Sequence, residues 1–400
     1  MPSKILTGLM RLKSDQALQK QFSGNIGLLC HSASIDENYQ HAAEIFIDLF
    51  GERFKKIYGP QHGFVTDVQD NMIETENFVH PYFKRPVYSL YSETRIPTDE
   101  MLEDIDHLFV DLQDVGTRIY TYIYTLTLLL EKCADKDIEV IVLDRPNPIG
   151  CDLIEGNILE PDFASFVGRH PIPVRHGLTI GEVARMHQKF WTSKTTHLKV
   201  LEMSGYKRNM FFTETALPYV NPSPNLPTIE GCLTFVGTVL LEGTSLSEGR
   251  GTTRPLEVIG HPKFEPWKWQ KHFKQVFNQL NLTGFILRPV AFHPMFQKHK
   301  DKTCGGYFIQ ITDRNIFQPW RVTQVLIKEF KRLLGGDFEY KTDAYEYEFE
   351  KLAIDLINGT DKIRSWYEND TSIDLEFLDR IEQKNMDQYL EKRSQILIYK

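Results

Sequence analysis

Short apolar runs alternate with amphipathic stretches along the first 150 residues. Five runs rich in aliphatic and aromatic side chains predict strands: residues 25–31, 54–60, 86–91, 107–115 and 138–148. Three stretches with apolar positions at helical spacing predict helices: residues 39–50, 98–105 and 118–137. Near-continuous apolar strands separated by helices favour an α/β fold, in which a mainly parallel sheet carries helices on both faces.

The pattern changes after this region. Residues 151–260 are rich in Gly, Pro and turn signals, whereas the last third returns to alternating helices and strands. The predicted elements of the last third are helices at 265–280 and 320–334, a strand at 305–313 and a charged helical end at 378–400. A chain of 400 residues is too long for one small core, so the change of texture near 225–245 predicts a domain boundary.

Polar side chains follow each predicted strand of the first half. These clusters are His31-Ser32, Gln61-His62, Tyr91-Ser92, Asp111 to Asp114 and Asp144 to Asn147. The carboxyl ends of parallel strands meet at one edge of a sheet, and ligands bind outside that edge in open α/β sheets. The clusters therefore predict a binding site there. Gln61 and His62 lie in the bend "GPQHGF" (59–64), enclosed by glycine and proline.

Composition and absent motifs exclude several classes of function. The net charge of −8 and the lack of a basic tract predict neither nucleic acid nor a membrane surface as a partner. The sequence has no P-loop, dinucleotide-binding fingerprint, zincin motif or nucleophile elbow. Thirteen histidines are dispersed without the spacing of metal ligands, so we expect no metal and no cofactor.

The cysteines and the N-terminal sequence bear on the compartment. Five scattered cysteines without a C-x-x-C pair indicate buried free thiols in a reducing environment. The N-terminal sequence lacks the apolar core of a secretion signal, and no apolar stretch approaches the length of a membrane helix. We therefore expect a cytoplasmic protein.

Two segments beside the predicted sheet combine acidic and polar side chains. In "DLQDVGTRIYTY" (111–122), Asp114 either caps the following helix or forms a lattice with Arg118 that holds a polar ligand. Tyr120 either packs in the core or contacts that ligand. In "LDRPNP" (143–148), Asp144 and Asn147 stand among rigid prolines, and a merely structural turn needs no such acidic residue, which favours a site.

The Gly- and Pro-rich middle region carries three further segments. In "VRHGLTIGE" (174–182), His176 precedes a predicted capping box and is a candidate ligand contact. In "PSPNLP" (222–227), the prolines pre-organise the amide of Asn225. The segment "LEGTSLSEGRGTT" (241–253) is either a solvated loop or a site, and its acidic, basic and hydroxyl groups among glycines favour a site. Its candidates are Glu242, Glu248, Arg250 and Thr252.

Together these segments resemble the exo-β-N-acetylmuramidase (NamZ) family, and the resemblance extends from "GNIGLLCHSASID" to the closing "RSQILIYK". It implies a Rossmann-like N-terminal domain (1–228), a smaller C-terminal α+β domain (229–400) and an active-site cleft between them. It also implies a glycosidase that releases N-acetylmuramic acid from the non-reducing ends of peptidoglycan fragments. Peptidoglycan-derived saccharides are then the expected partners.

One position departs from the family pattern. The resemblance implies "GPEHGF", in which the glutamate is a candidate for catalysis, whereas this chain has Gln61. Glycoside cleavage usually needs two carboxyl groups, and a glutamine side chain has no proton to give as the acid. The remaining catalytic candidates are, in order, Glu248, Glu242 and Asp114. The predicted substrate-binding residues are Gln61, His62, Arg118, Tyr120, Asp144, Asn147, His176, Asn225, Arg250 and Thr252.

Three interpretations of the site remain open. In the first, other carboxylates catalyse and Gln61 binds substrate. In the second, the 2-acetamido group of the substrate is the nucleophile, so that a single acid or polarising residue suffices. In the third, the chain is a non-catalytic or altered relative that binds amino sugars, because Gln61 replaces the usual glutamate.

Overall fold

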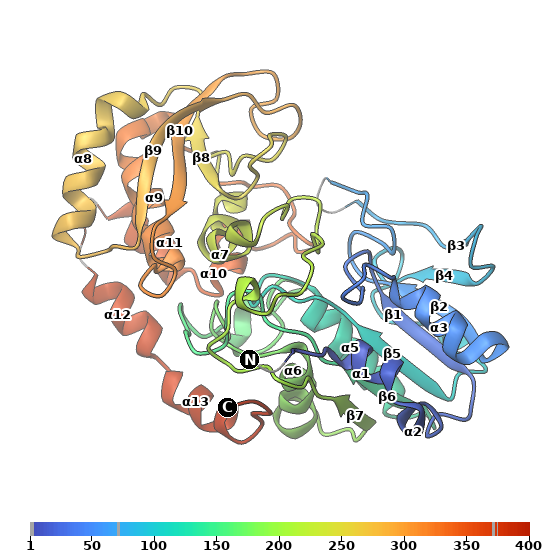
Figure 1. Ribbon diagram of the computed structural model, residues 1–400. Helices are drawn as coiled ribbons and strands as arrows, with labels where there is room; N and C mark the ends of the chain where they lie inside the picture. The colour runs from blue at the N-terminus through green and yellow to red at the C-terminus, as the bar shows by residue number, and fades with distance from the viewer. Residues whose placement is uncertain (1–3, 70–72, 370–372, 374) are drawn as a thin grey trace.

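The larger, N-terminal part of the molecule is built on a seven-stranded sheet (Figure 1). The computed structural model describes residues 4–69, 73–369, 373 and 375–400. The strand order is β3-β4-β2-β1-β5-β6-β7, and every pairing is parallel except that of β3 with β4. The strands are β1 Ile26–Cys30, β2 Phe54–Gly59, β3 Phe78–Val79, β4 Pro86–Ser89, β5 His107–Asp111, β6 Glu139–Leu143 and β7 His197–Leu201. The predicted α/β fold class is confirmed.

Helices cover both faces of this sheet, as its strand pattern requires. Alternate strand residues point to opposite faces: Leu28 and Phe109 pack in one core cluster with residues of α1 and α3, while Leu29 and Val110 pack in another with residues of α5 and α6. The helices of this half are α1 Gly8–Ser14, α2 Gln16–Gln19, α3 Ala42–Phe50, α4 Asp99–Leu102, α5 Tyr122–Cys133 and α6 Ile180–Met186. The predicted capping box opens α6, because the Thr179 hydroxyl accepts the Glu182 N–H and Glu182 accepts the Thr179 N–H.

The smaller C-terminal part is built on a three-stranded antiparallel sheet of order β8-β10-β9. Its strands are β8 Val258–His261, β9 Phe285–Phe292 and β10 Cys304–Ile311. The rings of Phe273 in α8, Tyr307 in β10 and Phe330 in α9 pack together and join the sheet to its helices. The helices are α7 Ile229–Thr238, α8 Pro266–Gln279, α9 Pro319–Leu334, α10 Ala353–Asn358, α11 Lys362–Glu368, α12 Glu376–Gln383 and α13 Met386–Ser394.

Short helical turns connect the main elements. Within the part of the chain that the structure describes, five are 3₁₀ turns: Gly51–Arg53, Pro161–Phe163, Phe212–Glu214, Val239–Gly243 and Gly335–Asp337. His187–Trp191 is a π-helical turn that continues α6. Among the described residues, no helix is long and apolar enough to span a membrane.

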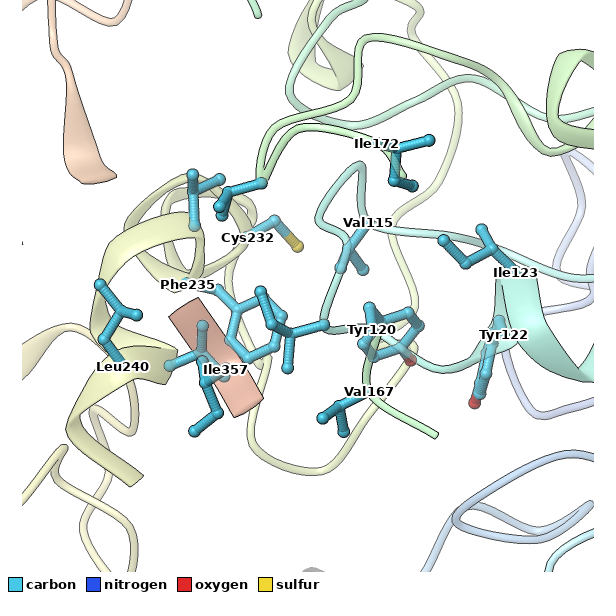
Figure 2. Close-up of a cluster of buried hydrophobic side chains, with 14 of the residues drawn as sticks. Val115, Tyr120, Tyr122, Ile123, Val167, Ile172, Cys232, Phe235, Leu240 and Ile357 are labelled. Atoms are coloured by element: carbon cyan, nitrogen blue, oxygen red, sulfur yellow. The ribbon is translucent and has the colours of Figure 1, made fainter. Parts of the chain in front are cut away.

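The two parts share one apolar core. Figure 2 shows side chains from both parts in this cluster, with Tyr120 and Val167 of the N-terminal part facing Phe235 and Ile357 of the C-terminal part. The rings of Tyr120 and Phe235 meet edge to face with centroids 6.2 Å apart. A continuous apolar contact fixes the two parts relative to each other and so holds the groups between them in place.

Arg118 connects the same two parts by hydrogen bonds. Its guanidinium donates to the carbonyl oxygens of Asn157 and Ile172, at 2.8 and 3.0 Å. It also donates to those of Ile357 and Asn358, at 3.0 and 2.8 Å. The side chain is fully buried, and burial lowers its pKa to about 10, which still leaves it charged at neutral pH.

We expect Arg118→Met to lower the free energy of unfolding by about 3–5 kcal/mol, because four buried carbonyls lose their donors. Urea unfolding measures this loss. Arg380→Met is the control, because the Arg380 side chain is 68% exposed, and it should change stability by less than about 0.5 kcal/mol. Unchanged stability with weakened saccharide binding would instead support the predicted substrate-binding role of Arg118.

Candidate active site

The bend after β2 holds Gln61 between the two parts of the molecule. Gly63 N–H donates to the Pro60 carbonyl at 2.9 Å, and His62 and Gly63 both have positive φ, at +70° and +75°. The Gln61 amide oxygen accepts from the Thr121 hydroxyl at 2.5 Å. Its amide nitrogen donates to Oε1 of Glu346 at 3.2 Å. Gln61 is therefore fixed at both ends of its side-chain amide.

A small cavity lies against this bend, with a volume of about 50 Å³. Tyr120, Val167 and Phe235, which Figure 2 shows facing one another, form part of its apolar wall. The polar residues that line it are Gln61, His62, Thr121, Ser223, Glu242, Arg250, Tyr345 and Glu346. The first three come from the carboxyl edge of the parallel sheet, and the last four come from the C-terminal part.

Arg250 organises two glutamates at this cavity. Its Nη2 lies 2.5 Å from Oε1 of Glu242, and its Nε lies 3.3 Å from Oε1 of Glu248. The Tyr345 hydroxyl donates to Oε2 of Glu242 at 2.6 Å. Burial opposes ionisation of Glu242, but Arg250 and Tyr345 outweigh it and hold the pKa of Glu242 below its ordinary value. Glu242 is thus an ionised carboxylate at neutral pH.

Lys298 holds Glu248 from the other side. Its ammonium lies 2.6 Å from Oε2 of Glu248 and donates to the carbonyls of Leu241 and Leu246 at 2.7 and 2.6 Å. Glu242, Glu248 and Lys298 also line a groove of about 590 Å³ next to the cavity. Glu242 therefore faces both spaces.

Glu346 has the opposite electrostatic setting. Burial raises the pKa of its carboxyl group above the ordinary value, and the charge of Glu242 raises it further. The hydroxyl of Tyr91, which follows β4, donates to Oε2 of Glu346 at 2.9 Å. The neighbouring His62 is neutral at physiological pH, because burial and the charge of Arg250 lower its pKa to about 4.

The structure brings together part of the predicted set. Gln61, His62, Tyr120, Glu242 and Arg250 line the cavity. Glu248 contacts Arg250 from the side of the groove. These residues form the candidate site, and their roles stay predictions.

The pair of Asp114 and His176 lies elsewhere: Asp114 is in the loop after β5, and His176 is in the segment before α6. Asp114 Oδ2 accepts the N–H of Gly116 at 2.8 Å and lies 3.4 Å from Nε2 of His176. The other ring nitrogen of His176 accepts the Leu178 N–H at 3.2 Å. Both side chains are buried and bond to the backbone of their own segments, in keeping with the capping alternative for Asp114.

Asp144 and Asn147 hold the segment before α6. Asp144 accepts from the Thr179 hydroxyl and the Gly181 N–H, both at 2.8 Å, and burial raises its pKa to about 7. Asn147 donates to the Leu178 carbonyl at 3.0 Å. Neither residue lines the cavity, so these polar groups fix the backbone at the carboxyl edge of the sheet.

Asn225 and Thr252 also bond to nearby backbone. The Asn225 amide donates to the Gln69 carbonyl at 2.5 Å, and the Thr252 hydroxyl donates to the Gly249 carbonyl at 2.6 Å. With Arg118, Asp114, His176, Asp144 and Asn147, they lie outside the residues that line the cavity. We do not carry these seven residues into the candidate site.

Sequence reasoning missed four polar residues of the cavity. Thr121 lies inside the segment 111–122, and Ser223 lies in the proline-rich segment around Asn225. Tyr345 and Glu346 lie in "AYEYEF", which has no turn former and no motif. No local signal identifies them, because only the fold brings them to Gln61.

We expect Arg250→Met to destabilise the protein by about 3–5 kcal/mol at pH 7, because Glu242 and Glu248 then remain buried without that counter-charge. In the wild type, the lowered pKa of Glu242 contributes stability that is present above its unfolded-state value of about 4.5 and is lost at lower pH. In the variant, buried carboxylates take up protons readily. The stability difference should therefore shrink between pH 7 and pH 4 in thermal unfolding, and a difference that stays constant with pH would contradict this role.

Comparisons with known proteins place this chain in a family. The family models for the N- and C-terminal domains of exo-β-N-acetylmuramidase NamZ match residues 26–230 and 233–399. The peptidoglycan β-N-acetylmuramidase NamZ of Bacillus subtilis (strain 168) is 39% identical over 397 residues, which cover 99% of this chain and 92% of that protein.

Two crystal structures of DUF1343 family proteins from Bacteroides fragilis NCTC 9343 share the fold. One has a TM-score of 0.88 at 30% identity and covers 99% of each chain. The other has a TM-score of 0.74 at 28% identity and covers 100% of this chain and 99% of that one. On the two family models and the Bacillus subtilis relative, the chain belongs to the exo-β-N-acetylmuramidase NamZ family.

Proposed function

We propose that the protein is a glycoside hydrolase that releases N-acetylmuramic acid from the non-reducing ends of peptidoglycan fragments. Family membership supports this activity, and the Bacillus subtilis relative is named a peptidoglycan β-N-acetylmuramidase. Membership alone does not identify the groups that act in this chain, because Gln61 stands where the resemblance implies a glutamate.

The observation that carries the proposal is the position of Glu242. This carboxylate is kept ionised by Arg250 and Tyr345, and it faces a cavity whose other walls supply amide, hydroxyl and imidazole groups. Glycoside hydrolysis requires such a carboxylate, as a nucleophile, as a base for water, or as a group that stabilises positive charge at the anomeric carbon. In a substrate-assisted reaction, the charge of Glu242 would stabilise the acetamido group that acts as the nucleophile.

The two spaces beside Glu242 are suited to binding the end of a saccharide chain. The groove of about 590 Å³ offers room for the rest of a saccharide, and the smaller cavity shares Glu242 with it. A volume of about 50 Å³ holds only one or two water molecules. Admission of a hexose therefore requires one wall of the cavity to move, as happens in enzymes that close over their substrates.

A non-catalytic amino-sugar-binding relative is the second candidate. Gln61 favours it, because a primary amide has no proton to give to a leaving group, whereas it hydrogen-bonds sugar hydroxyls well. The presence of Glu242 in the same cavity weighs against it, because a purely binding site has no need of a desolvated carboxylate.

A location in the cytoplasm is part of the same proposal. The five cysteines of the chain are all buried and unpaired, which supports a reducing environment and therefore the cytoplasm. An exo-acting muramidase there would act on wall fragments that have been taken up, so we assign it to cell-wall recycling.

We expect the protein to release N-acetylmuramic acid from a MurNAc–GlcNAc disaccharide, and Glu242→Gln to lower kcat/KM by about 10²-fold or more. Mass spectrometry of the products measures both. Glu230→Gln is the matched control, because that residue is exposed on α7, and it should leave the rate unchanged. Saturable binding without turnover in the wild type would replace this proposal with the binding protein.

A further inference from the structure

Glu346 reaches the cavity on a strained turn. Tyr345 and Glu348 form an isolated antiparallel bridge, with two residues between them. Those two residues, Glu346 and Tyr347, have positive φ of +48° and +68°. Such turns normally use Asn and Gly, and each non-glycine residue in this conformation costs on the order of 1–3 kcal/mol. The chain thus holds a glutamate where local preference disfavours it.

Contacts with the N-terminal part hold this turn at the cavity. Glu346 accepts hydrogen bonds from Gln61 at 3.2 Å and from Tyr91 at 2.9 Å. Next to it, the Tyr347 ring stacks on the guanidinium of Arg95 at 3.8 Å. The carboxyl group of Glu346 is therefore positioned by groups that follow β2 and β4, at the carboxyl edge of the sheet.

Two carboxyl groups whose pKa values are shifted in opposite directions face one cavity. Burial and the nearby charge of Glu242 raise the pKa of Glu346, whereas Arg250 and Tyr345 outweigh burial at Glu242 and lower its pKa. Nη1 of Arg250, which also lines the cavity, is buried and has no hydrogen-bond partner within the described residues. Pairs of carboxyl groups whose environments separate them in this way divide the acid and base roles in glycosidases.

We propose that Glu346 is the general acid of the glycosidase and that Gln61 is the residue that positions it. The assignment rests on the proposed function. Geometry carries it: the Glu346 carboxyl group lies in the cavity that Glu242 also lines, and the Gln61 amide holds it from the sheet edge.

The reaction balances with these two groups. Glu346 gives its proton to the glycosidic oxygen while the bond from that oxygen to the anomeric carbon breaks, and the rest of the saccharide leaves as an alcohol. A water molecule adds its oxygen to the anomeric carbon and loses one proton to a carboxylate, either Glu242 in a direct displacement or Glu346 after a covalent or acetamido intermediate. The products are N-acetylmuramic acid and the shortened saccharide.

This assignment accounts for the glutamine in the bend. A second carboxyl group at position 61 would lie about 3 Å from Glu346, and two carboxyl groups at that distance share a proton. With Gln61, the amide donates to Glu346 and accepts from Thr121, so the carboxyl group keeps one defined position. Catalysis then needs no titratable proton on residue 61.

Glu346→Gln tests the role through the leaving group. We expect kcat/KM for a MurNAc–GlcNAc disaccharide to fall about 10²–10⁴-fold, and kcat/KM for a 4-nitrophenyl β-muramide to fall less than about tenfold, because nitrophenolate leaves without a proton. The basic limb of the pH profile for the disaccharide should disappear. Glu350→Gln is the control, because it is exposed on the same segment, and it should leave both rates unchanged.

Gln61→Glu provides a second test that keeps Glu346 in place. The added carboxyl group raises the pKa at which the pair loses its last proton, so the basic limb of the wild-type profile should move to higher pH. If Glu346→Gln fails to fold, Gln61→Glu still tests whether Glu346 is the general acid.

Two results would overturn the assignment of Glu346. They are equal losses on both substrates in Glu346→Gln and an unshifted basic limb in Gln61→Glu. A wild type that cleaves neither substrate would instead contradict the proposed function, and the assignment with it.

Discussion

The arrangement of the candidate site depends on the burial of one guanidinium between two glutamates. Arg250 pairs with Glu242 and with Glu248, and Lys298 adds a second positive charge behind Glu248. Without these charges, two desolvated glutamates would take up protons or draw in water, and the cavity would lose its ionised carboxylate. With them, Glu242 stays charged, and its charge adds to the effect of burial, which raises the pKa of a third glutamate, Glu346. The ion-pair cluster thus keeps Glu242 ionised and contributes to the raised pKa of Glu346.

Much of the fold follows from local sequence. The apolar runs from residue 25 to residue 148 place five strands of the larger sheet, and the pattern Thr179-x-x-Glu182 marks the start of α6. Strand β9 shows where such reasoning stops. It carries Pro289 in its middle and lies at the edge of its sheet, where the missing N–H of a proline is tolerated. From the sequence alone, that proline argues against a strand.

The site was harder to predict than the fold. Asp144 and Arg118 look like ligand-binding residues in sequence, because acidic and basic side chains beside a predicted sheet edge have no evident structural use. Their partners explain them: Arg118 bonds to carbonyls as far away as Asn358, and Asp144 bonds to the hydroxyl of Tyr399. Glu346 shows the converse: its segment carries no motif, and only its contact with Gln61 indicates that it belongs to the site. Long-range contacts are what the sequence pattern does not encode.

The hydrogen bond between Tyr399 and Asp144 also bears on the order in which contacts of the larger sheet form during synthesis. The Tyr399 hydroxyl donates to Oδ2 of Asp144 at 2.6 Å and accepts the N–H of Met203 at 2.8 Å. Close by, Ile398 N–H donates to Glu182 at 2.9 Å. After α12 and α13, the C-terminal residues return to the N-terminal part, beside α6 (Figure 1). A ribosome makes these residues after the N-terminal part, so the polar groups at this end of the larger sheet lack their C-terminal partners until that later segment has been made.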